Sequence, residues 1–171
     1  MVEQAKYEVV RNLGKVEIRS YPRMTIARVE GYGDGGFNLL FRYIAGKNRQ
    51  SAKVSMTAPV VAERISMTAP VLSGADSLAF VLPEKYRLAT APQPLDDHVH
   101  IVEIPPRVVA ALQFSGRWST KIFAKKANEL LKDLGEAGIK TSGSVFSMRY
   151  NGPFTPWFMR RNEVAIVVKS K

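Results

Sequence analysis

The chain has 171 residues, of which 46% are apolar, so it is long enough to bury the core of one globular domain. Cysteine is absent, which excludes disulfides, thiolate metal sites and thiol catalysis. The formal net charge of +10 favours anionic partners such as nucleic acid, acidic lipid, or a small molecule that carries carboxylates or phosphates.

The first third of the chain predicts a β-hairpin, a further strand and a helix. The hairpin strands flank a short loop at Asn12-Leu13-Gly14, and Pro22 interrupts the chain before the third strand. The helix is amphipathic, and Gly46 ends it. We expect its apolar face to consist of Phe37, Leu40, Phe41 and Ile44, and the strands and helix to cover residues 6–10, 15–21, 24–31 and 36–46.

The hexapeptide SMTAPV occurs twice, eleven residues apart, within residues 51–74. Apolar and polar residues alternate in both copies, which predicts two strands that each have one apolar face. Pro59 and Pro70 predict that these strands end there or lie at a sheet edge. Met56 and Met67 are candidate metal ligands, but a methionine on an inner strand face is more often core filler.

The rest of the chain predicts five more strands and a second helix. Ser119 or Thr120 is a suitable N-cap for this helix, and Gly135 follows its last apolar residue. An aromatic loop that contains several prolines precedes the last strand. The helix is expected at 120–134, and the strands at 78–84, 98–104, 107–116, 145–150 and 163–169.

The two halves of the chain, roughly residues 6–84 and 85–169, resemble each other at an offset of 83 residues. Each half is predicted to run strand, interrupted strand, helix, strand, strand. We therefore expect a single domain over residues 1–171, built from two pseudo-symmetric half-units, with a ligand-binding space where the halves meet. The identical pairs are Val16 and Val99, Ile18 and Ile101, Pro22 and Pro105, and Ala27 and Ala110.

The only histidines, His98 and His100, lie in the motif DDHVH. With Asp96 and Asp97 they could form a metal clamp or a pair of axial ligands. They alternate with apolar residues, however, which is typical of the solvent-facing side of a strand, and we favour that interpretation.

The segments KVSMTAPV, YIAGKN, LAFVLPE and YNGPF…RRNEVAIVV resemble the SOUL haem-binding protein family over roughly residues 6–169. The resemblance implies an α+β fold, a distorted antiparallel β-barrel with two helices, that binds haem or a related tetrapyrrole. Members that ligate haem through a histidine place it where this chain has Ser20. The resemblance therefore implies weak or non-axial ligation of any bound iron.

The resemblance also implies an apolar groove between the first helix and the late aromatic loop. A porphyrin is a flat apolar disc with two carboxylates, so it needs aromatic walls and cations at the rim. Trp157 and Phe158 are placed to stack, and Arg42 or Arg160 to meet a propionate. The implied groove residues are Leu39, Arg42, Tyr43, Phe154, Trp157, Phe158, Met159 and Arg160.

No catalytic motif is recognisable, so we expect a protein without enzymatic activity. The first hypothesis is a tetrapyrrole buffer or carrier, and the alternative is an effector-binding or sequestering module like those of some bacterial regulators. A third is an interaction protein that uses its basic surface. The basic residues are scattered, so we expect no nucleic-acid binding. Neither a membrane-spanning run nor a signal peptide is visible, so we expect a cytoplasmic protein without integral membrane association.

Overall fold

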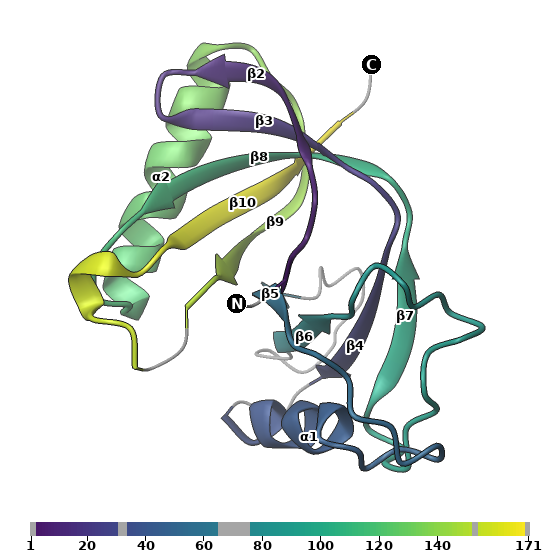
Figure 1. The fold of residues 1–171 in the computed structure, drawn as a ribbon. Coiled ribbons are helices and arrows are strands. Elements are labelled where there is room, and N and C mark those ends of the chain that lie inside the picture. The colour runs from purple at the N-terminus through teal and green to yellow at the C-terminus, as the bar shows by residue number, and fades with distance from the viewer. Residues whose placement is uncertain (1–2, 31–33, 65–75, 152–153, 170–171) are drawn as a thin grey trace, which may run out of the picture. The chain divides into compact units, whose positions relative to one another are not determined.

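The structure is a computed structural model in which two α-helices and ten strands are described (Figure 1). The α+β class with two helices and mostly antiparallel strands is confirmed. A closed barrel and a pseudo-twofold relation stay predictions. The described residues are 3–30, 34–64, 76–151 and 154–169.

The chain divides into two compact units. Unit 1 comprises residues 1–5 and 23–105, and unit 2 comprises residues 6–22 and 106–171. In unit 1 the antiparallel strands follow the order β5-β6-β4-β7, and β1 pairs with β5 in parallel. The elements of unit 1 are β1 (Glu3–Gln4), β4 (Met24–Glu30), α1 (Asp34–Ile44), β5 (Thr57–Arg64), β6 (Asp76–Val81) and β7 (His100–Ile104).

Helix α1 packs against β4 and β6 and closes the core of unit 1 (Figure 1). Leu40 and Ile44 of the predicted apolar face are buried, whereas Phe37 and Phe41 are 42% and 52% exposed. The Phe37 ring still meets the buried Phe80 ring edge to face at 5.2 Å. Tyr43, only 1% exposed, occupies the buried face instead. Its hydroxyl donates a hydrogen bond to a backbone carbonyl 2.6 Å away, so its polar end is satisfied inside the protein.

The first SMTAPV copy differs from its prediction. Strand β5 begins at Thr57 and continues through Pro59, so the prediction that the strand ends at this proline is wrong. The register shifts between Thr57 and Val60, and a proline is tolerated at such a bulge because the regular hydrogen-bond ladder is interrupted there. Met56 precedes the strand and packs against the core of unit 1, as expected of core filler. The second copy lies outside the described residues.

Unit 2 holds an antiparallel sheet in the order β2-β3-β8-β10-β9. The predicted N-terminal hairpin is confirmed, but its turn is formed by Gly14 and Lys15. Gly14 has a φ of +60°, a conformation that glycine adopts without a steric cost. The elements of unit 2 are β2 (Glu8–Leu13), β3 (Val16–Tyr21), β8 (Arg107–Phe114), α2 (Thr120–Glu136), β9 (Thr141–Arg149), the 3-10 helix η1 (Trp157–Met159) and β10 (Asn162–Val168).

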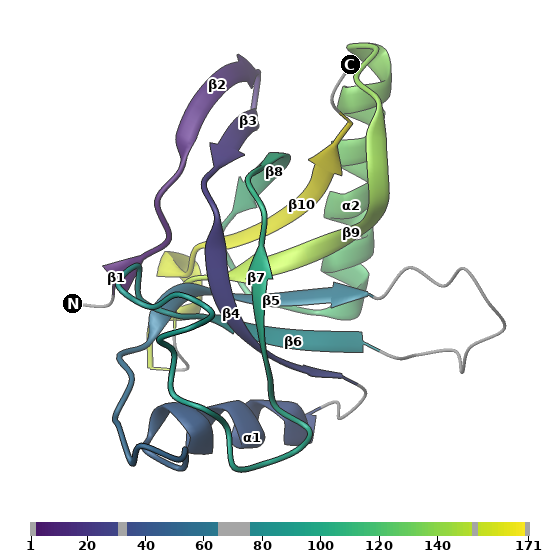
Figure 2. The same cartoon turned by 90° about the vertical axis from the view of Figure 1, so that its right-hand side faces the viewer.

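Helix α2 covers one face of this sheet (Figure 2). Ser119 caps it, because its hydroxyl oxygen accepts a hydrogen bond from the Ile122 backbone N–H at 3.1 Å. The sequence predicts one apolar face for this helix, with Phe123, Ala127, Leu130, Leu131 and Leu134. Leu130 and Leu134 are fully or almost fully buried against apolar side chains of β3, β8 and β10, whereas Leu131 is 42% exposed. The strand residues of this core are Val16, Ile18, Ala110, Leu112, Val164 and Ile166.

The compact units do not coincide with the two halves expected from the sequence repeat. The order β3, β4, α1, β5, β6 recurs as β7, β8, α2, β9, β10, as the repeat predicts. However, β3 belongs to the first half and pairs with β8 in unit 2, whereas β7 belongs to the second half and pairs with β4 in unit 1. Each unit is therefore built from strands of both halves.

A buried ion pair joins β3 and β10 across the intervening strand β8. Arg19 is 1% exposed and Glu163 is fully buried. One guanidinium nitrogen donates to a Glu163 oxygen at 2.8 Å, and a second nitrogen donates to the other oxygen. The remaining donors meet Glu17 at 2.8 Å and the Tyr21 hydroxyl at 3.1 Å. This bidentate arrangement compensates for the removal of both charges from water.

Two further groups support the pair. Arg161 donates to a Glu163 oxygen at 3.2 Å and to the Tyr7 hydroxyl at 2.9 Å, and the Arg19 guanidinium lies 4.2 Å from the centre of the Tyr7 ring. Burial alone would raise the pKa of Glu163, but the hydrogen bond and the charge of Arg19 outweigh it and hold that pKa below its usual value. Glu163 is therefore ionised at neutral pH.

We expect Arg19→Leu to lower the free energy of unfolding by about 3–5 kcal/mol, because it leaves the Glu163 carboxylate buried without its main counter-charge. The double variant Arg19→Leu/Glu163→Leu should recover much of this loss, since no buried charge remains unpaired. Urea unfolding at pH 7 measures both values. A double variant no more stable than the single variant would contradict this reason for the loss.

Candidate functional site

A cavity of about 250 Å³ lies in unit 1 beside the C-terminal half of α1. One wall comes from the helix and the residue just after it, and the other from the segment that leads into β7. Apolar side chains dominate the lining, with two cations and one carboxylate among them. The lining residues are Leu39, Arg42, Tyr43, Lys47, Pro94, Leu95, Asp96 and Val99.

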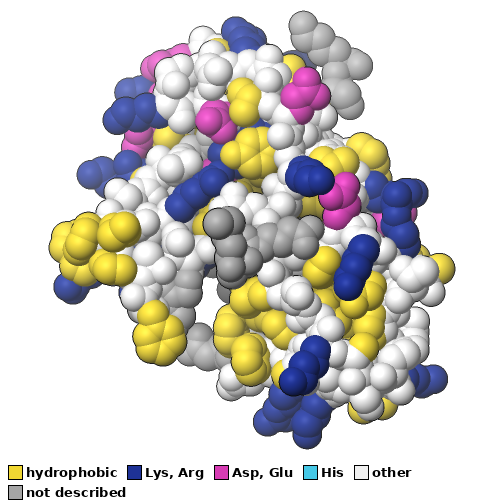
Figure 3. Space-filling model, viewed as in Figure 1, with side chains coloured by type: hydrophobic (Ala, Val, Ile, Leu, Met, Phe, Trp, Pro, Cys, Tyr) yellow, Lys and Arg dark blue, Asp and Glu magenta, His cyan; other side chains and the backbone are white. Residues whose placement is uncertain are grey.

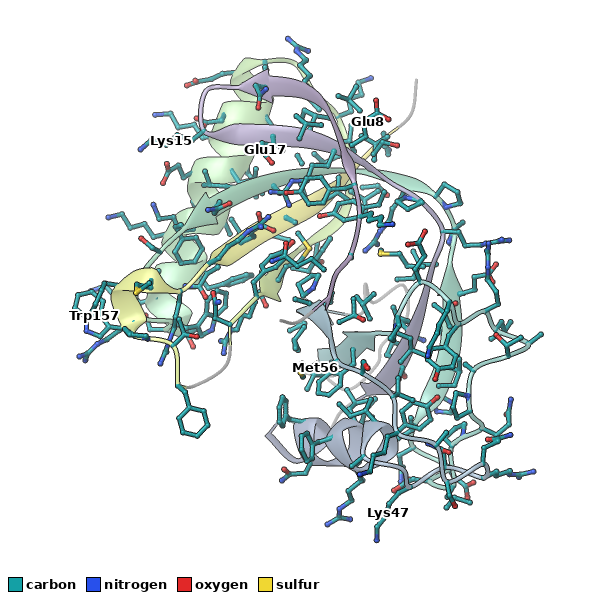
Figure 4. All side chains as sticks on the ribbon, viewed as in Figure 1. Glu8, Lys15, Glu17, Lys47, Met56 and Trp157 are labelled. Carbon is teal, nitrogen blue, oxygen red and sulfur yellow. The ribbon has the colours of Figure 1, made fainter. Side chains whose placement is uncertain are left out.

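The helix contributes Leu39, Arg42 and Tyr43 to the cavity because residues three and four positions apart share a flank of an α-helix. Gly46, with a φ of +114°, then turns the chain so that Lys47 also lines the space (Figure 4). Gln93 accepts a hydrogen bond from the Arg49 backbone N–H at 2.8 Å and so ties the two walls together.

Tyr43 forms a buried wall of the cavity. Its hydroxyl donates to the Pro92 carbonyl at 2.6 Å, and Asn48 donates to the Tyr43 carbonyl at 3.1 Å. Burial, with a contribution from the neighbouring Tyr86, raises the pKa of Tyr43 to about 12. The side chain is thus a neutral wall whose hydroxyl is already used.

The cavity carries more positive than negative charge, with Arg42 and Lys47 against Asp96. One Asp96 oxygen accepts from the His98 backbone N–H at 2.8 Å and lies 2.8 Å from the His98 ring nitrogen Nδ1. Those bonds and the charge of Arg42 lower the pKa of Asp96. Asp96 is thus an ionised group already engaged with His98.

The predicted solvent-facing side of the DDHVH motif is confirmed. His98 and His100 are exposed, whereas Val99 is buried and Ile101 packs against the core. Across the described ranges, no group of three or more His, Asp or Glu side chains is arranged to hold a metal ion. Ser20 lies near the end of β3, in the second strand of the hairpin, as expected.

The late loop forms a separate apolar projection in unit 2. Phe154, Trp157, Phe158 and Met159 are 99%, 50%, 60% and 65% exposed. The Trp157 and Phe158 rings meet edge to face at 5.6 Å. Arg160 donates to the Thr155 carbonyl at 2.9 Å and so closes the loop on itself.

The structure brings the expected groove residues together as two sets. Leu39, Arg42 and Tyr43 share the cavity of unit 1, and residues 154–160 form the loop of unit 2. That both sets contact one ligand stays a prediction. Lys47 also lines the cavity, although the sequence indicated only the turn at Gly46 before it. The opposite wall, formed by Pro94, Leu95, Asp96 and Val99, was not predicted as part of a site.

Comparison with known families gives a match between the SOUL heme-binding protein family and residues 2–167. The chain belongs to this family. It is 28% identical to Heme-binding protein 1 of Xenopus tropicalis over 125 residues, which are 73% of this chain and 65% of that protein. It is 29% identical to Heme-binding protein 2 of Homo sapiens over 142 residues, which are 80% and 66% of the two proteins. The chain thus spans just under two thirds of the length of these relatives.

Solved structures share the fold at low sequence identity. The C-terminal domain of EcmrR superposes with a TM-score of 0.63 at 9% identity and covers 96% of this chain and 99% of its own. SAV2435 bound to tetraphenylphosphonium superposes with a TM-score of 0.54 at 14% identity, with 96% and 94% covered. Separately, neither of the two described α-helices has the length and apolar composition needed to cross a bilayer.

We expect Tyr43→Phe to lower the free energy of unfolding by about 1 kcal/mol at pH 7, because it removes a buried hydrogen bond. The variant should also lose less stability than the parent between pH 10 and pH 12. A raised phenol pKa stabilises the fold below the unfolded pKa of about 10, and this contribution disappears as the pH rises through the folded value. Urea unfolding at pH 8, 10 and 11 tests this, and parallel pH profiles would contradict it.

Proposed function

We propose that this protein binds haem or a related tetrapyrrole and acts as a buffer or carrier. The observation that carries the proposal is the cavity beside α1, whose mainly apolar lining includes Arg42 and Lys47. A porphyrin edge combines an apolar ring with two propionates. Apolar walls with two cations match that chemistry, because charge-assisted hydrogen bonds to carboxylates are among the stronger polar contacts.

The size of the cavity suggests how much of the ligand it takes. Ligand pockets commonly measure about 300–1,000 Å³, so the 250 Å³ cavity suits an edge of the ring rather than the whole disc. We propose that the exposed loop at residues 154–160 is a second apolar surface that contacts tetrapyrrole, with Trp157 stacked on a ring. The exposure of its aromatic side chains supports this role, since they are accessible to a ligand.

We propose that iron is weakly ligated or not ligated by the protein. Ser20 has no strong donor for iron, and Met56 packs against the core of unit 1. The affinity would then come from ring stacking and from the propionates. Metal-free protoporphyrin should consequently bind about as well as hemin.

The alternative, an effector-binding or sequestering module for apolar cations, is supported by the fold shared with EcmrR and SAV2435. Such a ligand needs a buried carboxylate as its counter-charge. Within the described part of the chain, Glu163 is the buried carboxylate, and Arg19 engages both of its oxygens. The charge arrangement therefore favours an anionic ligand over a cationic one.

We further propose a cytoplasmic protein without enzymatic activity. Its single domain over residues 1–171 would descend from a duplication, with half-units at roughly 6–84 and 85–169 arranged as a pseudo-symmetric distorted barrel. The repeated order of elements supports the duplication.

The decisive test is a fluorescence and absorbance titration with hemin and with metal-free protoporphyrin IX. We expect micromolar binding of both. Arg42→Ala should weaken binding about tenfold or more, the loss expected for a charge-assisted hydrogen bond. Lys53→Ala, an exposed cation of the same unit that does not line the cavity, is the matched control and should leave the affinity unchanged.

Esterification of the ligand separates charge from stacking. Protoporphyrin dimethyl ester keeps the ring but lacks both carboxylates, so we expect the parent protein to bind it at least tenfold more weakly than the free acid. The ester should bind the parent protein and Arg42→Ala with equal affinity. No saturable change with hemin or protoporphyrin would refute the proposed function. Equal affinity for the acid and the ester would refute the role of the cations.

We expect tetraphenylphosphonium to leave the melting temperature unchanged, because Arg19 already neutralises the Glu163 carboxylate. Differential scanning fluorimetry with a concentration series of this cation measures the effect. A saturable rise in the melting temperature would instead support the effector-binding alternative.

A further inference from the structure

The net positive charge of the protein lies in one of its two units. Unit 2 contains 16 Lys and Arg against 6 Asp and Glu, a formal charge of +10, whereas unit 1 contains 9 of each sign and is neutral overall. Long-range attraction to an anionic surface therefore arises mainly from unit 2.

One end of unit 2 concentrates these cations. The segments 115–126 and 149–162 carry seven Lys and Arg and no Asp or Glu. They lie side by side, because the Asn162 side chain donates to the Gly116 carbonyl at 3.0 Å and the Arg117 guanidinium lies 5.4 Å from the Trp157 ring. Partial burial and the positive charge of Arg160 lower the pKa of Arg149. The seven basic residues are Arg117, Lys121, Lys125, Lys126, Arg149, Arg160 and Arg161.

The same end carries the two most exposed large apolar side chains of the described chain, Phe154 and Met159. Phe154, Trp157, Phe158 and Met159 project from it, and Figure 4 shows Trp157 at the outer edge of the unit. Figure 3 shows hydrophobic side chains at this edge with a basic side chain beside them. An apolar tip of this kind with basic residues around it is unusual on a surface that meets only water.

The tip is held in place by hydrogen bonds at its base. The Tyr150 backbone N–H donates to the Arg161 carbonyl at 3.2 Å, and the Arg161 backbone N–H donates to the Asn151 side chain at 2.6 Å. Pro156 precedes η1 and accepts from the Met159 backbone N–H at 2.9 Å. The exposed apolar side chains therefore lie on a loop whose ends are joined by hydrogen bonds.

We propose that this end of unit 2 docks on anionic membrane surfaces. The aromatic and methionine side chains of residues 154–159 enter the interface between headgroups and acyl chains, and the exposed cations Arg117, Lys121 and Lys125 meet acidic headgroups. Aromatic rings favour that interface, and each basic residue near an anionic leaflet strengthens binding about fivefold. A lipid surface fits better than single-stranded nucleic acid. The Trp157 and Phe158 rings meet at 89° and so offer no parallel platform for successive bases. Met159 has no aromatic ring on which a base could stack.

Sedimentation of the ligand-free protein with vesicles tests the proposal. Vesicles with 30% phosphatidylserine should bind at least tenfold more protein than phosphatidylcholine vesicles. Phe154→Ser/Phe158→Ser and Arg117→Gln/Lys121→Gln should each weaken binding at least tenfold. Two control variants, Leu88→Ser at an exposed apolar position of unit 1 and Lys53→Gln, should bind like the parent. Circular dichroism melts establish that all variants fold.

Tryptophan emission gives an independent measure of insertion. Acidic vesicles should shift the emission to shorter wavelength, and Trp157→Phe should abolish the shift while it preserves sedimentation. Binding that is unchanged in Phe154→Ser/Phe158→Ser would overturn the proposal, as would binding to a single-stranded RNA oligonucleotide but not to vesicles. Arg42→Ala lies in unit 1 and should weaken hemin binding but not vesicle binding, so failure of the two proposals can be distinguished.

Discussion

The bidentate bond between Arg19 and Glu163 sets the electrostatics of unit 2. It joins β3 to β10 on the sheet face opposite α2, and it neutralises the buried carboxylate within the protein. Without Arg19, the buried Glu163 carboxylate would keep only its longer contact to Arg161 at 3.2 Å. The pair itself adds no net charge, so the formal charge of +10 of unit 2 comes from its other basic residues. Because Arg19 engages both carboxylate oxygens, Glu163 is not available as a counter-charge for a cationic ligand.

The two units then offer different chemistry. Unit 1 is neutral overall and holds a small cavity in which Arg42 and Lys47 stand beside apolar walls. Unit 2 is strongly basic and exposes an aromatic loop with cations around it. Membership of the SOUL heme-binding protein family agrees with the apolar and cationic character of these surfaces. The same aromatic loop also gives the protein a surface for acidic lipid.

Periodicity and capping residues predicted where the helices and strands lie better than they predicted which side chains are buried. Ser119 and the apolar spacing before Gly135 located α2, and alternation located most strands. The sequence did not predict that Tyr43 is buried on α1 while Phe37 and Phe41 are half exposed. Tyr43 is buried because its hydroxyl finds a hydrogen-bond partner, and a hydrophobicity pattern carries no information on that. Pro59 lies within a strand because a bulge accommodates it, and bulges have no sequence signal of their own.

Parts of the site could not be predicted because they depend on contacts between distant segments. Arg19 and Glu163 are 144 residues apart, and in the sequence Arg19 looks like an ordinary polar residue of an alternating strand. The far wall of the cavity comes from residues 94–99. Their path is fixed by hydrogen bonds from Tyr43 of α1 and from Arg49 after it to the carbonyls of Pro92 and Gln93. Leu39, Arg42 and Tyr43 were found through the family resemblance, and the cavity now gives them a physical reason.

The central claim is that the cavity of unit 1 takes a tetrapyrrole edge through its apolar walls and the cations Arg42 and Lys47. Backbone amide chemical shifts of labelled protein, followed during titration with metal-free protoporphyrin IX, test it most directly. The account predicts that residues 39–47 and the facing residues 94–99 respond and saturate along one binding curve. A titration in which these residues do not respond would contradict it.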